Sequence, residues 1–331
     1  MVHKKKVKGL GLCSGGLDSI LSALVLREQG IDVSWIAFKT PFFSADNSRK
    51  ASINNGIPLI VKNITDRYMP MLRNPPCGYG KHMNPCMDCH ALMFRIAGEM
   101  MAKTESDFLF SGEVMGQRPM SQNKNSLRYV EKNSGYDGYI LRPLSAKVLP
   151  ETPMELNGLV DREKLCGFSG RSRKPQIALA QQFGVVDYPS PAGGCLLTDG
   201  GYSKRLKDLF DHQGKWSVPE LNLLKHGRHL RLDKNVKIVV GRNKKDNENM
   251  LRYYRPDKDI LIKTKDIPGP VTLIPNGCGD DAVVRVASIT AGYSKATKDE
   301  PVTVFVTQPD GRKEIAVTPI PNTEVQDLLI P

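Results

Sequence analysis

The chain has 331 residues, of which 40% are hydrophobic and 25% are charged, and its formal net charge is +12. These proportions are those of a folded globular protein, and the length suffices for two domains. No apolar run approaches the roughly 20 residues of a membrane span, and the basic start is followed by a run too short for a signal peptide. We therefore expect a cytoplasmic protein with no membrane association and with a polyanion among its partners.

The first half of the chain alternates strand-like and helix-like segments. Strands are expected at 7–13, 31–38, 57–61 and 107–111, helices at 18–29, 45–54 and 90–103, and a loop at 69–85. This alternation predicts an α/β fold in which helices cover a parallel sheet. Ligands of such sheets bind at the carboxyl ends of the strands. The loop after the first strand, the region of Cys86 and the segment Ser111-Gly112-Glu113 should therefore meet at one edge.

The sequence changes character near residue 200. Helices are expected at 202–211 and 220–224, followed by strands at 236–240, 260–263, 271–274, 283–289 and 302–306. Residues 201–265 contain 17 Lys and Arg against 8 Asp and Glu, a net charge of +9 by this count. We expect a first domain at 1–200, a basic linker with helices at 201–230, and a smaller α+β or mostly β domain at 231–331.

The hexapeptide Ser14-Gly15-Gly16-Leu17-Asp18-Ser19 joins the first expected strand to the first expected helix. Paired glycines permit a tight turn whose N–H groups face an anion, and the helix N-terminus adds donors and a positive dipole end. Neither the Walker spacing nor the dinucleotide-binding G-x-G-x-x-G fits this loop. The hexapeptide resembles the PP-loop of the ATP pyrophosphatases, which split ATP between its α- and β-phosphates and adenylate a substrate oxygen.

This resemblance implies an adenine nucleotide alpha hydrolase-like fold and a set of nucleotide-binding residues. Asp18 is expected to position Mg²⁺, because a carboxylate beside phosphates suits a hard cation. Gly112 is expected to line the adenylate pocket, and Arg142 or Lys147 to contact phosphate, the alternative for each cation being a surface ion pair. The expected nucleotide-binding set is Ser14, Gly15, Gly16, Asp18, Ser19, Gly112 and Arg142.

The chain contains seven cysteines, an odd number that argues against a disulfide framework. Cys86 and Cys89 form a C-x-x-C pair immediately before an expected helix, where the helix N-terminus favours thiolates. Such a pair serves in zinc sites, in redox sites and in iron–sulfur sites. The pair alone does not distinguish these three kinds of site.

The run Asn84-Pro85-Cys86-Met87-Asp88-Cys89, together with the PP-loop, resembles the bacterial tRNA 2-thiouridylases. In that family the cysteine at the position of Cys89 is catalytic, and a second catalytic cysteine lies in a later Gly-rich loop, where Cys195 stands here. Related PP-loop thiolation enzymes hold a 4Fe-4S cluster with three cysteines. We favour such a cluster on Cys86, Cys89 and Cys195, with a persulfide on Cys89 or Cys195, a zinc site or a structural role as alternatives.

The segments 238–247 and 259–269 resemble the RNA-binding domain of the NFACT family. The resemblance implies RNA binding, although residues 261–263 and 270–271 depart from the pattern of that family. Exposed cations in such a domain are expected to contact RNA phosphates. The candidates are Arg242, Lys244, Lys245, Arg252 and Arg255.

Together the resemblances imply a transferase that thiolates a uridine of tRNA at the expense of ATP. The C2 or C4 oxygen of uracil is adenylated, and sulfur then replaces it. ATP, Mg²⁺, tRNA and a sulfur donor (sulfide, or a cysteine desulfurase or sulfur carrier) are the expected partners, and a homodimer is compatible with the sequence. The alternatives are a PP-loop ligase or sulfurtransferase acting on a small molecule, and a non-catalytic RNA- or ribosome-associated factor.

Overall fold

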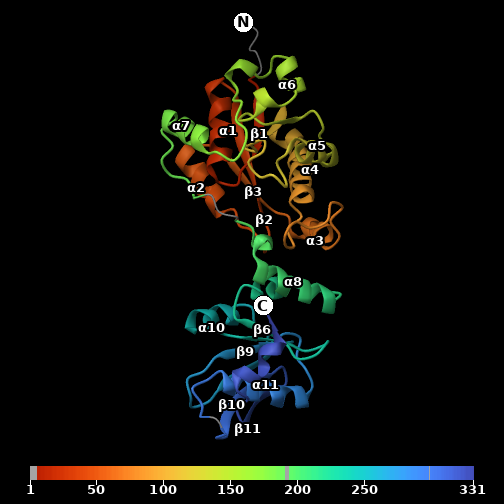
Figure 1. The fold of residues 1–331 in the computed structure, drawn as a ribbon, viewed down its shortest axis with the longest axis vertical. Helices are drawn as coiled ribbons and strands as arrows, with labels where there is room; N and C mark the ends of the chain where they lie inside the picture. The colour runs from red at the N-terminus through yellow and green to blue at the C-terminus, as the bar shows by residue number, and fades with distance from the viewer. Residues whose placement is uncertain (1–5, 191–193, 298) are drawn as a thin grey trace. The chain divides into compact units, whose positions relative to one another are not determined.

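The structure, a computed structural model, describes residues 6–190, 194–297 and 299–331. The chain forms two compact units, Met1–Thr198 and Asp199–Pro331 (Figure 1). The segment expected as a basic linker, 201–230, is folded into the second unit. Within the described residues, no helix has the length and apolar character that crossing a membrane requires.

The first unit is built on a five-stranded sheet in which every pair of neighbouring strands is parallel. Its order is β3-β2-β1-β4-β5, so the chain reverses direction across the sheet after β3. The predicted α/β fold with a parallel sheet is therefore confirmed. The strands are β1 (Lys8–Leu12), β2 (Asp32–Lys39), β3 (Leu59–Asn63), β4 (Phe108–Ser111) and β5 (Ile140–Leu141).

Helices cover both faces of this sheet, with α1, α2 and α7 on one face and α4 and α5 on the other (Figure 1). Trp35, Phe108 and Phe110 are fully buried in the core. Four of the helices, α3, α5, α6 and α7, were not expected from the sequence. The helices of the unit are α1 (Leu17–Glu28), α2 (Asp46–Asn55), α3 (Thr65–Arg73), α4 (Cys86–Thr104), α5 (Lys124–Ser134), α6 (Pro153–Leu156) and α7 (Lys174–Gln182), with short 3-10 turns η1 (Ala146–Val148), η2 (Arg162–Lys164) and η3 (Leu196–Thr198).

The second unit is built on an antiparallel sheet of seven strands in the order β11-β10-β8-β9-β7-β6-β12. Its strands are β6 (Arg228–Arg231), β7 (Lys237–Val240), β8 (Ile260–Thr264), β9 (Val271–Ile274), β10 (Val302–Gln308), β11 (Gly311–Val317) and β12 (Leu329–Ile330). Its helices are α8 (Gly200–His212), α9 (Val218–Leu223), α10 (Lys244–Leu251), α11 (Asp280–Gly292) and the 3-10 segment η4 (Asn322–Leu328). The unit is therefore α+β, one of the two folds expected for it.

The strand expected at 283–289 was wrong, because these residues form the middle of α11. Val283, Val286, Ala287 and Ile289 are buried against the sheet, and their spacing places them on one face of a helix. The helix begins after Gly279 with Asp280 and Asp281 in its first turn, where acidic side chains favour the helix dipole. The prediction failed because residues 283–289 are rich in β-branched side chains, which favour strands.

Candidate active site and RNA-binding surface

The PP-loop lies where expected, between the end of β1 and the start of α1. Gly15 adopts a left-handed conformation (φ 73°), and a Cβ there would lie 2.2 Å from the carbonyl carbon of Asn47. The position therefore requires glycine on two counts. Gly16 caps α1 without a side-chain acceptor, while Ser19 Oγ donates to the carbonyl of Gly16 at 2.8 Å and Ser14 is exposed. The loop thus presents a helix N-terminus open to an anion.

Gly112, at the end of β4, packs directly on the first turn of α1. A Cβ at Gly112 would lie 2.3 Å from the carbonyl carbon of Asp18 and 2.5 Å from the amide nitrogen of Ser19. The Asp18 carboxylate accepts a hydrogen bond from Gln117 Nε2 at 3.0 Å, and burial raises its pKa. The sequence prediction that the segment after β4 borders the PP-loop therefore matches the geometry.

Glu113 is the centre of a buried ion-pair network beside this contact. Its carboxylate accepts from Arg142 Nε at 3.0 Å and from Ser111 Oγ at 3.0 Å, and it lies 2.7 Å from His90 Nδ1. Burial acts to raise the pKa of Glu113, but Arg142 and His90 outweigh it and hold that pKa at about 2. Glu113 is therefore ionised and links the start of α4 to the end of β4.

The phosphate contact expected for Arg142 is corrected by this network. Arg142 is only 3% exposed, and its guanidinium pairs with Glu113 and with Glu131 of α5. These two carboxylates neutralise its charge inside the unit, so the role of Arg142 here is to position Glu113. Lys147 likewise pairs with Glu163, at 3.3 Å, on the surface.

The three cysteines expected to act together are close enough to influence one another. Cys86 and Cys89 lie in the first turn of α4, and Cys195 immediately precedes η3. Burial raises the pKa of Cys89, and negative charge on Cys195 or Cys86 raises it further. Burial raises the pKa of Cys195 to about 11, again with a contribution from Cys86. The neighbouring residues 192 and 193 of the expected Gly-rich loop lie outside the described residues.

Two residues that sequence reasoning missed contact these thiols. The buried hydroxyl of Tyr68 on α3 hydrogen-bonds the Cys89 thiol, and all three cysteines act to raise the pKa of Tyr68. Asn84 Nδ2 donates to Cys86 Sγ at 3.3 Å. The Asn-Pro-Cys spelling was a usable signal for Asn84. Tyr68 had none, because it comes from a segment distant in sequence whose helix contains Pro70.

The donor chemistry of these cysteines fits a soft metal centre better than a hard one, because thiolates are soft ligands. Thiolates that raise one another's pKa are also stabilised by a cation between them. As placed in residues 6–190, 194–297 and 299–331, however, no three His, Cys, Asp or Glu side chains converge tightly enough to hold a metal ion. The three cysteines match an iron–sulfur or zinc site in ligand type. Their thiols would have to move closer together to bind one.

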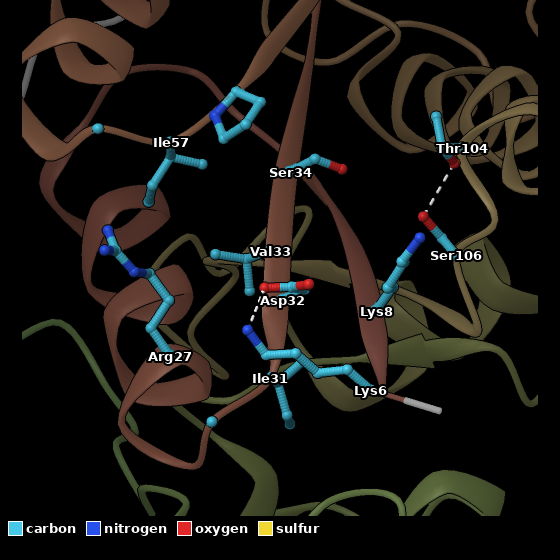
Figure 2. Close-up of a pocket in the computed structure, with 13 residues that line it drawn as sticks. Lys6, Lys8, Arg27, Ile31, Asp32, Val33, Ser34, Ile57, Thr104 and Ser106 are labelled. Carbon is cyan, nitrogen blue, oxygen red and sulfur yellow. Dashed lines mark hydrogen bonds and ion pairs between the residues drawn. The ribbon is translucent and has the colours of Figure 1, made fainter. Parts of the chain in front are cut away.

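A pocket of about 470 Å³ opens at the opposite end of the sheet, near the amino ends of β1 and β2 (Figure 2). Lys6, Lys8 and Arg27 contribute to its lining. Lys6 pairs with Asp32 at 2.6 Å and Lys8 with Glu105 at 2.6 Å, so both ammonium groups already have carboxylate partners. Because ligands of parallel sheets bind at the carboxyl ends, this pocket is not the candidate active site.

In the second unit, α10 gathers most of the expected RNA contacts. Arg242, Lys244 and Lys245 stand at its start and Arg252 at its end, and all four are exposed. Arg242, which precedes the helix, also pairs with Asp246 in its first turn. The exposed cations in and beside α10 therefore remain candidates for contacts with RNA phosphates.

The contact expected for Arg255 is corrected. Its guanidinium pairs with Asp259 at 2.6 Å and with Glu220 at 3.3 Å, and it donates to Asn276 at 3.0 Å. Asp259 is 2% exposed, so Arg255 neutralises a buried charge. A further feature was not expected: the half-buried rings of His226 and Tyr253 stack, with centroids 5.9 Å apart.

Family models match parts of both units. In the first unit the first strand of a parallel sheet leads through a Ser-Gly-Gly loop into a helix, and the second unit is built on an antiparallel sheet. Residues 5–147 match the model of the family described as Thiamine biosynthesis protein (ThiI), and residues 227–329 match that of the NFACT protein RNA binding domain. The resemblance of the C-terminal segments to the NFACT RNA-binding domain is confirmed by the second match.

Curated relatives carry names from tRNA thiolation. The chain is 27% identical to the tRNA-specific 2-thiouridylase MnmA of Clostridium acetobutylicum over 236 residues, which cover 62% of the chain and 60% of that relative. It is 27% identical to a probable tRNA sulfurtransferase of Moorella thermoacetica over 148 residues, which cover 42% of the chain and 36% of that relative. The chain thus spans less than two thirds of the length of these relatives.

Similar solved structures include a 4-thiouridine synthetase–RNA complex with bound ATP, with 17% identity and a TM-score of 0.39, covering 66% of this chain and 52% of that one. Another is the C-terminal part of the fibronectin/fibrinogen-binding protein from Streptococcus suis, with 15% identity and a TM-score of 0.29, covering 74% of this chain and 94% of that one. Similarities this low support no functional argument.

Proposed function

We propose that this protein thiolates a uridine of tRNA in an ATP-dependent reaction. A uracil carbonyl oxygen, at C2 or C4, attacks the α-phosphorus of ATP, the bond from the α-phosphorus to the bridging oxygen breaks, and pyrophosphate leaves. Sulfur then adds to the adenylated carbon, and AMP leaves with the original oxygen. The observation that carries this proposal is the presence of a PP-loop and three mutually interacting thiols in one unit.

The contacts around Glu113 place the PP-loop close to the cysteines at the start of α4. Gly112 packs on the backbone of Asp18, and the next residue, Glu113, pairs with His90. His90 directly follows Cys89 in the first turn of α4. A substrate oxygen at the PP-loop would therefore have thiols nearby for the second step.

The α1 N-terminus would bind the phosphates, and Asp18 would hold Mg²⁺ against them. Cys86, Cys89 and Cys195 would hold the 4Fe-4S cluster favoured from the sequence, which when bound supplies an iron without a protein ligand as a carrier of sulfide. Without a cluster, a persulfide on Cys89 or Cys195 would be the nucleophile; AMP would leave, and the thiol of the other cysteine would attack the resulting disulfide, so that thiouridine is released and the two cysteines end as a disulfide. Sulfide is the proposed donor for the cluster route, and a desulfurase or carrier protein, which transfers sulfur from its own persulfide to the cysteine thiol, is the proposed donor for the persulfide route.

The exposed cations of α10 would bind the tRNA backbone. Base stacking adds sequence-tolerant affinity to such contacts, and the His226–Tyr253 pair is a candidate platform. The similarity of residues 227–329 to an RNA-binding family supports this assignment.

The test is an anaerobic reaction after iron–sulfur reconstitution, with tRNA that lacks thiouridine, Mg-ATP and sulfide. Nucleosides from the digested tRNA are identified by mass spectrometry, and absorbance separates C2 from C4 products. Thiouridine that requires ATP is the expected result. Iron-free protein is then tested with a cysteine desulfurase and cysteine in place of sulfide: thiouridine formed without iron indicates the persulfide route, and thiouridine formed only with reconstituted protein and sulfide indicates the cluster route.

Cysteine variants sharpen this test. Cys89→Ala should abolish thiouridine formation while tRNA-dependent pyrophosphate release continues, because adenylation precedes sulfur transfer. The control is Cys166→Ala, since Cys166 is partly buried and does not interact with the three thiols. Pyrophosphate release without tRNA would instead indicate a small-molecule substrate, and RNA binding without any ATP cleavage would indicate a non-catalytic factor.

A further inference from the structure

The segment that begins α7 brings a cation to the PP-loop. Arg173 Nη2 lies 3.9 Å from Asp18 Oδ1, and the Arg173 side chain is 21% exposed. Arg173 Nε is buried and has no hydrogen-bond partner among the described residues. Arg173 therefore has an N–H donor beside the anion-binding loop that forms no hydrogen bond within the described residues.

Gln176, one turn further along α7, is fully buried, and neither atom of its amide forms a hydrogen bond of good geometry within the described part of the chain. The amide faces the Asp18 carboxylate and lowers its pKa through a weak hydrogen bond. Asp18 Oδ1 also lacks a hydrogen-bond partner among the described residues. Asp18, Arg173 and Gln176 therefore gather at one place with part of their hydrogen-bonding capacity unused, which is unusual for buried polar groups in a folded protein.

Contacts outside this cluster fix the α7 segment over the PP-loop. The amide of Gly170 donates to the carbonyl of Met115 at 2.8 Å, and Met115 forms a β-bridge with Ser169. The segment that holds Met115 is the one whose Gly112 packs on Asp18. Arg173 and Gln176 are thereby held near the carboxyl end of β4, on the side where the nucleotide would bind.

Charge shows why a cation is needed here. The hexapeptide 14–19 contains no lysine or arginine, and its one charged residue is the carboxylate of Asp18. The triphosphate of ATP would face that carboxylate unless cations intervene. Arg173 and Arg118 both lie near enough to Asp18 to lower its pKa.

We propose that Arg173 and Gln176 form the second half of the phosphate site. This assignment rests on the proposed function. In the free protein Arg173 faces Asp18; when Mg-ATP binds, Mg²⁺ takes its place beside Asp18, and the guanidinium turns to the phosphates that leave as pyrophosphate. Gln176 donates its free amide N–H groups to the same phosphates. No covalent step is assigned to either residue.

The test is binding of Mg²⁺ with α,β-methylene-ATP, whose cleavage is blocked, measured by calorimetry on the full chain without tRNA. Arg173→Ala should weaken binding about 10- to 100-fold, as expected for charge-assisted hydrogen bonds, and leave adenosine binding unchanged. Arg171→Ala is the matched control, because Arg171 is exposed two residues away. Arg173→Lys, which keeps the charge, should recover part of the affinity.

Gln176→Leu separates a binding role from a structural one. Removing a buried amide whose hydrogen bonding is this incomplete should not lower the thermal midpoint of the free protein, while the affinity for the nucleotide analogue falls several-fold. If Arg173→Ala binds the analogue as tightly as Arg171→Ala does, the assignment is overturned and the proposed function is untouched. If the wild type binds no analogue at all, the proposed function and this assignment both fall.

Discussion

Nδ1 of His90 lies 2.7 Å from Oε1 of Glu113, and this contact joins the helix that carries Cys86 and Cys89 to the strand end beside the PP-loop. Arg142 holds the far side of the same carboxylate at 3.0 Å. A charge this deeply buried is tolerated only because it is paired on both sides. The network therefore sets the distance between the PP-loop and the helix that carries Cys86 and Cys89.

Glu113→Gln should strongly destabilise the first unit. The substitution keeps the shape of the side chain but leaves the buried guanidinium of Arg142 with Glu131 alone. We expect a loss of about 3 kcal/mol in the free energy of unfolding, measured by urea denaturation.

Glu163→Gln is the control for this measurement, because Glu163 pairs with Lys147 at the surface, with 88% of its side chain exposed. Its effect should stay within about 0.5 kcal/mol. Equal effects of the two substitutions would mean that the Glu113 network does not stabilise the fold.

Gly112→Ala should distort the PP-loop. The added Cβ would lie 2.3–2.5 Å from backbone atoms of Asp18 and Ser19, which cannot move aside without shifting α1. We expect a lower thermal midpoint and weaker binding of Mg-ATP. Gly194→Ala, where a Cβ would meet nothing within 4 Å, should leave the thermal midpoint unchanged. A normal midpoint and normal nucleotide affinity in Gly112→Ala would contradict the close packing.

Contiguous motifs explain what could be predicted from the sequence. The PP-loop is a run of six consecutive residues, and Cys86 and Cys89 are three residues apart. Each motif lies beside a strand or helix that the hydrophobic periodicity predicts. Their place at the carboxyl edge of the sheet follows from local pattern alone.

Partners that are distant in sequence explain what could not. Arg142 and Arg255 look like surface cations, but Glu113 and Glu220 lie 29 and 35 residues away from them. Only the fold brings these charges together and buries them. Arg173 was missed for the same reason, since its neighbour Asp18 lies in another helix.

Lys245→Ala should weaken tRNA binding without changing stability. Lys245 is exposed at the start of α10. Its loss should therefore reduce the slope of log affinity against log salt concentration by about one. Affinity is measured by filter binding across a salt series.

Arg255→Ala makes the matching contrast. It leaves Asp259 buried without its strongest partner, so we expect a loss of about 3 kcal/mol or more in the stability of the second unit. A folded Arg255→Ala variant with normal stability and a reduced salt dependence would restore the original assignment of Arg255 to RNA.

Lys237 should give the second unit a distinctive dependence on pH. The ammonium is 5% exposed and lies 2.8 Å from Asp208 Oδ2. Burial lowers the pKa of Lys237 to about 8, although Asp208 acts to raise it, against 10.5 for an ordinary lysine. Between these two values the unfolded chain binds more protons than the folded one, so stability rises with pH across that window.

The measurement compares wild type with Lys237→Met, in which Asp208 keeps its two hydrogen bonds from Arg231, at 3.0 and 2.7 Å. Pulse proteolysis in urea, with fragments of the second unit identified by mass, gives its free energy of unfolding at each pH. From pH 7.5 to 10.5 the wild type should gain up to about 3 kcal/mol relative to the variant, since one pKa unit corresponds to about 1.4 kcal/mol. Because tyrosines and cysteines titrate equally in both proteins, only their difference reports on Lys237. A difference that stays constant or shrinks as the pH rises would show that the folded lysine keeps an ordinary pKa.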